Sequence, residues 1–119
     1  MAHSFGSQIR ERRKERGYTL RQLAPLLGIN FAYLSKLEND RADHPPSEEL
    51  IRQIAKTLEL DQDKLIYLAG RITQSDAKMI EDLVKNNPEE ACILFRKMKE
   101  NPNFANSFIR KIGKSNSID

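Results

Sequence analysis

Apolar residues recur at intervals of three and four along the whole chain, and no useful length of it alternates apolar with polar residues. Spacing of three and four places side chains on one face of an α-helix, whereas alternation is typical of a β-strand. Glycine, proline and small polar residues interrupt the pattern at short intervals. The sequence therefore predicts an all-α protein built from short helices.

Start and stop signals in the first 70 residues predict five helices that form one compact domain. Ser, Thr, Asn and Asp side chains accept hydrogen bonds from free N–H groups at a helix start, and glycine is typical of a helix end. These signals place helices over residues 7–16, 20–27, 31–38, 48–58 and from 61 or 62 to 69, with Pro25 expected to shorten or bend the second. The residues expected to face inward are Phe5, Ile9, Leu20, Leu23, Leu27, Leu34, Leu37, Leu50, Ile51, Ile54, Ala55, Leu58, Leu65, Ile66 and Leu68.

Residues 20–38 meet the requirements of two helices joined by a tight turn. Gly28 supplies a backbone conformation that is costly for other residues, and Ala24 is small where the two helices would meet. Ile29 and Leu34 are apolar anchors beyond the turn. This arrangement leaves the outward face of the second helix free to touch a partner.

Three stretches of the sequence resemble a known family in their residues, their order and their spacing. They are IRERRKERGYTLRQLA (residues 9–24), LGINFAYLSKLEND (27–40) and PSEELIRQIAKTLELDQDKLIYLAG (46–70). Residues 6–70 resemble the phage-repressor-like (Cro-type, XRE family) helix-turn-helix domain. The resemblance implies a five-helix lambda-repressor-like fold and a sequence-specific transcriptional regulator that binds double-stranded DNA.

The third predicted helix would carry the base-reading residues. Leu34 and Leu37 face inward, so the opposite side of its first half faces outward and matches the base-reading positions of the resembling family. Lysine donates to guanine O6 and N7, serine to several partners, and apolar side chains contact the thymine methyl group. The resemblance implies base contacts from Phe31, Ala32, Ser35 and Lys36.

Contacts to the DNA backbone are expected from the rim of this surface. Free N–H groups and a positive helix dipole favour phosphate at the start of the second helix. Tyr33 has two alternatives, which are packing beside Leu37 and donation to a phosphate. The predicted phosphate contacts are Arg10, Thr19, Arg21, Gln22, Tyr33, Asn39 and Arg41.

Arg13 shares the inward face of the first predicted helix with Ile9. A charge on that face needs a partner, because an unpaired buried charge is costly. Glu38 can supply it, and both positions match a buried Arg–Glu pair found in many members of the resembling family. We therefore expect Arg13 and Glu38 to be a structural ion pair.

The charge distribution and the rare residue types narrow the function further. Residues 1–45 hold eight Lys/Arg against five Asp/Glu, whereas the rest of the chain holds twelve of each, which favours nucleic acid as a partner. The sequence shows no signal peptide or membrane span, and the lone Cys92 excludes an intramolecular disulfide, so we expect a soluble cytoplasmic protein. His3 and His44 are the only histidines, and no Gly-rich phosphate loop or metal-ligand spacing appears. We expect no catalysis, no cofactor and no metal.

After Gly70 the chain changes character. Asn87-Pro88 and Asn101-Pro102 divide residues 71–113 into about three short helices, and residues 114–119 are expected to be a flexible tail. The apolar residues of this region are Ile72, Met79, Ile80, Leu83, Val84, Leu94, Phe95, Met98, Phe104, Phe108, Ile109 and Ile112. So much apolar surface either packs back on the first domain or forms an interface. We favour a homodimer interface through Leu94, Phe95, Phe104, Phe108 and Ile112.

The function that the resemblance implies is that of a dimeric repressor that binds a pseudo-palindromic operator. The alternative is an interaction protein. In that case the chain would be an antitoxin, or a regulator of a defence operon, whose C-terminal region binds a toxin or a regulatory metallopeptidase.

Overall fold

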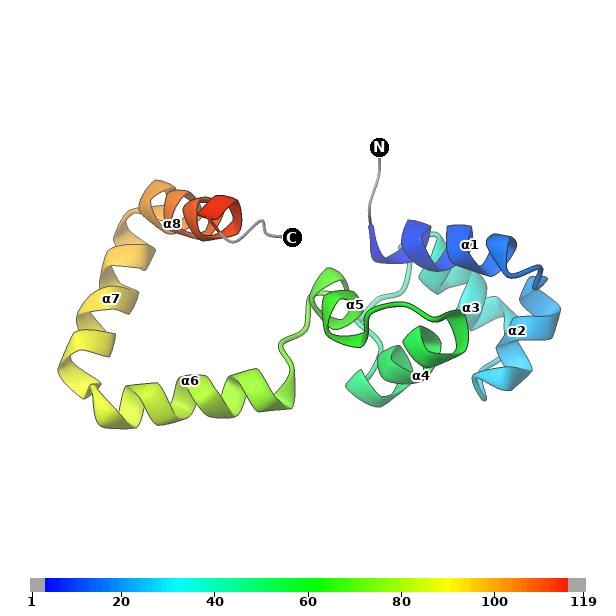
Figure 1. The fold of residues 1–119 in the computed structure, drawn as a ribbon, viewed down its shortest axis with the longest axis horizontal. Coiled ribbons are helices and arrows are strands. Elements are labelled where there is room, and N and C mark those ends of the chain that lie inside the picture. The colour runs from blue at the N-terminus through cyan, green and yellow to red at the C-terminus, as the bar shows by residue number, and fades with distance from the viewer. Residues whose placement is uncertain (1–3, 116–119) are drawn as a thin grey trace. The chain divides into compact units, whose positions relative to one another are not determined.

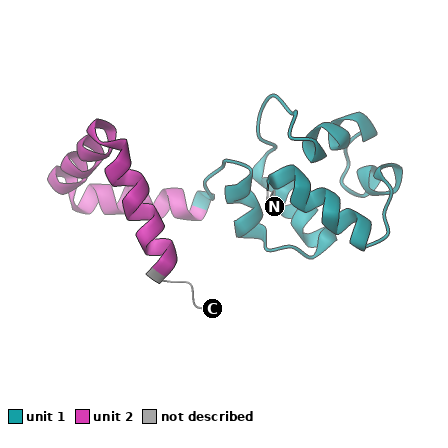
Figure 2. Ribbon diagram, turned by 90° about the horizontal axis from the view of Figure 1, so that it is seen from above, with its two compact units in different colours: residues 1–74 teal, residues 75–119 magenta. Residues whose placement is uncertain are grey.

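The computed structural model describes residues 4–115, and these residues form eight α-helices and no β-strand (Figure 1). The helices are α1 (Phe5–Glu15), α2 (Leu20–Leu26), α3 (Phe31–Glu38), α4 (Glu48–Leu58), α5 (Gln62–Leu68), α6 (Gln74–Asn86), α7 (Pro88–Glu100) and α8 (Pro102–Ser115). The prediction of an all-α chain, with five helices followed by a short helical region, is confirmed. The chain divides into two compact units, residues 1–74 and 75–119 (Figure 2).

Each of the first five helices begins at a side chain that accepts a hydrogen bond from the backbone of the first turn. The cap residues are Ser4, Thr19, Asn30, Ser47 and Asp61. Four of these helix starts agree with the sequence prediction, whereas α1 begins two residues earlier than Ser7. The earlier start arises because the Ser4 hydroxyl accepts from the backbone N–H of Ser7 at 3.1 Å and so caps one more half-turn.

One apolar core holds the five helices together. Its buried members are Phe5, Ile9, Leu23, Ala24, Leu27, Leu34, Leu37, Ile51, Ile54, Ala55, Leu58, Leu65 and Ile66. Leu20 and Leu50 are partly buried against this core. The expectation that Leu68 faces inward is wrong, because α5 packs through Leu65 and Ile66, and Leu68 lies about a third of a turn away from that face.

Gly6 marks the closest approach of α1 to the end of α3. A Cβ atom at this position would lie 2.5 Å from the backbone oxygen of Glu38 and 2.6 Å from that of Leu37. The backbone N–H of Gly6 donates to Asp40 Oδ1 at 2.9 Å, and the Ser4 hydroxyl donates to Asp40 Oδ2 at 2.7 Å. A carboxylate just after α3 therefore helps to cap the start of α1, and only glycine fits the contact.

The N-terminal unit extends past Gly70, the residue at which the sequence predicts the end of the first domain. Arg71 Nη2 donates to the backbone oxygen of Pro45 at 3.1 Å, and Arg71 Nε donates to that of Pro46. The backbone N–H of Gln74 donates to Glu48 Oε1 at 3.1 Å. Residues 71–74 are thus tied to the start of α4, which explains why the boundary lies at Gln74.

The C-terminal unit consists of α6, α7 and α8, which follow one another at sharp bends (Figure 1). No residue of α6 or α7 is buried. α7 and α8 begin at the prolines of the two Asn-Pro pairs, as predicted. Ile72, which was expected on the apolar stripe of the first of these helices, precedes α6. Lys114 and Ser115 belong to α8, whereas a tail was expected from residue 114; residues 116–119 lie outside the described part.

Five of the large apolar side chains of this unit line an open pocket of about 340 Å³ between α6 and α7. Ile80, Leu83 and Val84 contribute from α6, and Leu94 and Phe95 contribute from α7. Each of these five side chains is at least 37% exposed. None of the helices formed by residues 4–115 is long and apolar enough to span a lipid bilayer.

Candidate nucleic-acid interface

α2 and α3 pack against each other across the tight turn at Gly28. The backbone of Gly28 has a φ of +68°, a conformation that other residues rarely adopt. Ala24 is 2% exposed, and its carbonyl accepts from the backbone N–H of Ile29 at 3.1 Å. α3 therefore leaves the turn at a fixed angle to α2, with Leu34 and Leu37 buried beneath it.

The four residues predicted to read bases come together on the outward side of α3. Phe31, Ala32 and Lys36 are exposed, and Ser35 is half-buried. Asn30 caps the helix by accepting from the backbone N–H of Tyr33 at 2.7 Å. The outward side of α3 therefore presents one aromatic, one small apolar, one hydroxyl and one cationic side chain.

Tyr33 lies at the edge of this surface. Its side chain is half-buried and packs against the apolar core. Packing is one of the two alternatives that the sequence left open for Tyr33.

Arg21 and Phe31 join the two helices across the exposed surface. The Cζ atom of the Arg21 guanidinium lies 4.9 Å from the centroid of the Phe31 ring. An aromatic ring attracts a cation at this distance because the face of its π-system is negative. The sequence alone does not predict this contact, since nothing in the order of the residues brings position 21 over position 31.

Of the remaining rim residues, Thr19 and Gln22 lie at the start of α2, Asn39 and Arg41 follow the end of α3, and Arg10 lies in α1. Thr19 and Gln22 form a capping box, in which Thr19 Oγ1 accepts from the backbone N–H of Gln22 and Gln22 Oε1 accepts from that of Thr19. The Asn39 amide donates to the backbone oxygen of Ser35 at 2.8 Å. Arg10 and Arg41 are exposed. Three of these five side chains thus have a structural contact, and the two arginines extend into solvent.

Arg13 and Glu38 form a buried two-point ion pair between α1 and α3. Arg13 Nε lies 2.6 Å from Glu38 Oε2, and Arg13 Nη2 lies 3.0 Å from Glu38 Oε1. Arg13 Nη1 also donates to the backbone oxygen of Tyr18 at 2.8 Å. Because Arg13 is 8% and Glu38 5% exposed, the pair fixes the end of α3 on α1 from within and does not face a ligand.

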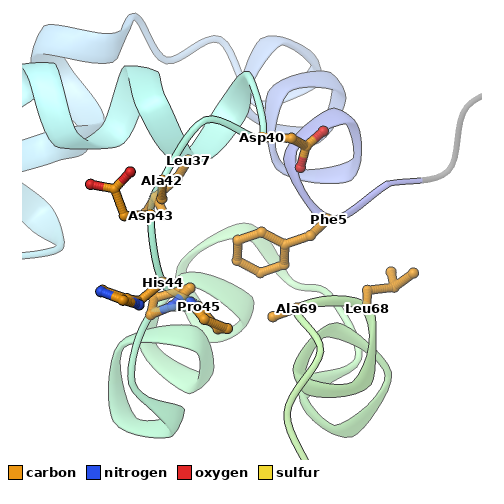
Figure 3. A pocket seen from close by; sticks show the side chains of 10 residues that line it. Phe5, Leu37, Asp40, Ala42, Asp43, His44, Pro45, Leu68 and Ala69 are labelled. Atoms are coloured by element: carbon orange, nitrogen blue, oxygen red, sulfur yellow. The ribbon is translucent and has the colours of Figure 1, made fainter.

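A pocket of about 200 Å³ lies on the side of the 40–46 loop, where Phe5 points between Pro45 and Ala69 (Figure 3). Asp40 is one of its polar residues, and both oxygens of its carboxylate are already hydrogen-bonded to Ser4 and Gly6. The carboxylate of Asp40 is therefore part of the α1 cap. The residues of this pocket include none of the four outward residues of α3.

Known proteins are similar to this chain in sequence. The family model HTH_3, helix-turn-helix, matches residues 9–65. The HTH-type transcriptional repressor RghR of Bacillus subtilis is 37% identical over 71 residues, which cover 60% of this chain and 52% of RghR. The HTH-type transcriptional regulator SlrR of the same species is 30% identical over 123 residues, covering 94% of this chain and 80% of SlrR.

Among solved structures, the N-terminal DNA binding domain of SinR from Bacillus subtilis is 31% identical and has a TM-score of 0.48. The match covers 55% of this chain and 93% of that domain. The chain spans about half the length of RghR but four fifths of SlrR. Because the helix-turn-helix match and the similarity to SlrR agree, this chain belongs to the HTH_3 family of helix-turn-helix transcriptional regulators.

Proposed function

We propose that the protein is a dimeric repressor that inserts α3 into the major groove of a pseudo-palindromic operator. The observation that carries this proposal is the outward face of α3, where three exposed side chains and the half-buried Ser35, all suited to base edges, lie on a helix that is packed against the core. The buried Arg13–Glu38 pair supplies much of that fixation. A base-reading helix needs such support, because hydrogen bonds to bases require a defined orientation.

The chemistry of the four side chains fits the major groove. Lys36 donates to guanine O6 or N7, and Ser35 donates to or accepts from several base edges. Phe31 and Ala32 contact thymine methyl groups. All four lie within the first six residues of α3, the half of a recognition helix that contacts base edges.

Phosphate contacts surround these base contacts in the proposal. Arg10 and Arg41 are exposed and reach the DNA backbone as charges. The hydroxyl proton of Thr19, the amide nitrogen of Gln22 and the hydroxyl group of Tyr33 take no part in the capping bonds described above, and they donate to phosphates nearby. The side-chain amide of Asn39 also donates to a phosphate. The position of Arg21 at the start of α2 predicts a phosphate contact for it as well.

The C-terminal unit supplies the homodimer contact in the proposal. One recognition helix reads only a few base pairs, so two copies related by a two-fold axis read half-sites one helical turn apart, roughly 34 Å. Five apolar side chains of this unit are each between 38% and 49% exposed, namely Leu94, Phe95, Phe104, Phe108 and Ile112. Contact of so much apolar surface with water is unfavourable and is typical of an interaction site. Burial between two copies removes that surface from water.

The same exposed apolar surface supports a second candidate function, in which the C-terminal unit binds a different protein. Such a partner would be a toxin, or a metallopeptidase that cleaves the regulator. Purification of the full chain with and without the products of neighbouring genes separates the two. A stable complex with a neighbouring product at the expense of the homodimer would support the second candidate.

Lys36→Ala is expected to change which sequence is preferred, whereas Arg41→Ala is expected to weaken binding to all sequences alike. A lost base contact costs roughly 1–3 kcal/mol at one position of the site. A lost phosphate contact reduces the dependence of affinity on salt by about one counterion. Titration of both variants against a panel of duplexes at two salt concentrations distinguishes them. A uniform loss for Lys36→Ala would remove Lys36 from the base-reading set.

A further inference from the structure

The Arg21–Phe31 contact sits at the junction of α2 and α3, on the exposed side of both helices. Arg21 is the second residue of α2 and Phe31 is the first residue of α3. Both side chains are exposed, Phe31 by 42%. Within residues 4–115, no carboxylate forms an ion pair with Arg21. The guanidinium is therefore held by an aromatic ring and keeps its N–H donors.

A guanidinium held against a ring differs from a free arginine in what it can recognise. The guanidinium is planar, so contact with the ring at 4.9 Å restricts its orientation while the donors along its edge stay available. A planar pair of donors matches the O6 and N7 acceptors of guanine, which is the commonest specific contact of arginine in the major groove. A phosphate contact needs no such orientation, because phosphate oxygens accept from many directions.

Phe31 has a second surface besides the one under Arg21. Its exposed part belongs to the outward side of α3, among the residues that the proposed function places against base edges. An apolar side chain there contacts the C5-methyl group of thymine. Because the Arg21 guanidinium lies 4.9 Å from the ring centroid, the two side chains present a planar donor group and an apolar group side by side.

We propose that Arg21 and Phe31 act as one base-reading unit that selects a guanine adjacent to a thymine in each half-site. Arg21 is then a specificity-determining residue rather than the phosphate contact expected from its position. Phe31 contacts the thymine and also orients the Arg21 guanidinium. This inference rests on the proposed function, since it assumes that α3 lies in the major groove.

The test uses the full chain and a selection of bound duplexes from a random library. Arg21→Lys keeps the positive charge but loses the planar pair of donors. We expect the preference for guanine at one position of each half-site to fall roughly 5- to 150-fold, the equivalent of one bidentate contact. The salt dependence of binding is expected to stay the same. Arg16→Lys is the matched control, because Arg16 pairs with Glu59 and belongs to no proposed DNA contact, and it should leave every base preference unchanged.

Phe31→Leu tests the coupling between the two side chains. Leucine keeps an apolar contact to the thymine methyl group but removes the aromatic face beneath Arg21. We therefore expect the thymine preference to persist while the neighbouring guanine preference weakens, although residue 31 does not contact the guanine. The helical circular dichroism of each variant should match that of the wild-type chain.

Two results would overturn the inference. If Arg21→Lys leaves the guanine preference intact, or if Arg21→Ala weakens all duplexes equally and lowers the salt dependence, Arg21 contacts phosphate. If the proposed function itself is wrong, the wild-type chain is expected to select no common sequence. That result differs from both outcomes above, in which the wild-type chain still selects a sequence.

Discussion

Replacing either Arg13 or Glu38 by alanine is expected to lower the free energy of unfolding by about 3–5 kcal/mol. Each substitution leaves the other charge buried without its partner, between α1 and α3. Arg13→Ala also removes the donor to the backbone oxygen of Tyr18. Denaturant unfolding of the two single variants, followed by circular dichroism, measures the loss.

The double variant identifies the cause of that loss. Replacing both residues removes both buried charges, so its effect is expected to be clearly smaller than the sum of the two single effects. Arg16→Ala is the control, because the Arg16–Glu59 ion pair is exposed and is expected to contribute less than about 1 kcal/mol. Additive losses of the size seen for Arg16→Ala would contradict a buried, coupled pair.

A chain that ends at Gln74 is expected to fold as a helical monomer and to bind the operator about 10²–10⁴-fold more weakly than the full chain. It keeps the whole apolar core and the bonds of Arg71 and Gln74 to the start of α4. It loses every exposed apolar side chain of α6, α7 and α8. Sedimentation measures the assembly, and binding titration measures the affinity.

A substitution in the full chain controls for the loss of length. Phe108→Asp places a charge in the apolar face of α8, where Phe108 is 49% exposed, so the folded N-terminal unit should be unaffected. We expect this variant to be monomeric and to bind as weakly as the shortened chain. A dimeric shortened chain, or a monomeric wild-type chain at micromolar concentration, would show that the C-terminal unit serves another partner.

Local signals in the sequence were sufficient to predict the helices of the N-terminal unit. Thr19, Asn30 and Ser47 cap helices through bonds to a backbone group three residues away, so neighbouring residues alone define those helix starts. The core stripes follow from helical spacing, and the main error, Leu68, arose in a helix too short to define a face by its own pattern.

Contacts between distant residues were harder to predict. Asp40 accepts hydrogen bonds from Ser4 and Gly6 at the start of α1, which lie 36 and 34 positions away. No local sequence pattern predicts such bonds. The pairing of Arg13 with Glu38 could be predicted because the resembling family has such a pair at these positions. The Arg21–Phe31 contact could not be predicted from the sequence and is seen only in the structure. The sequence likewise assigned residues 71–74 to the C-terminal region, whereas their bonds to the 45–48 segment attach them to the N-terminal unit.

The C-terminal unit shows the limit of helical periodicity. The Asn-Pro pairs predicted its three helices, because proline at the first position of a helix and an extended residue before it are local effects. Periodicity also identified the apolar residues, but it cannot say what covers them. Their partner depends on a second surface, and in the proposal that surface belongs to another copy of the chain.

The central claim is that α3 reads a specific DNA sequence, and selection of bound duplexes from a random library by the full chain tests it most directly. We expect one enriched pseudo-palindrome whose half-site centres lie roughly 34 Å apart, about one turn of the duplex. Lys36→Ala should lose the base preference at a defined position of each half-site and retain the others. Recovery of no common sequence by the wild-type chain, or of an unchanged sequence when Phe31, Ser35 and Lys36 are all replaced by alanine, would contradict the claim.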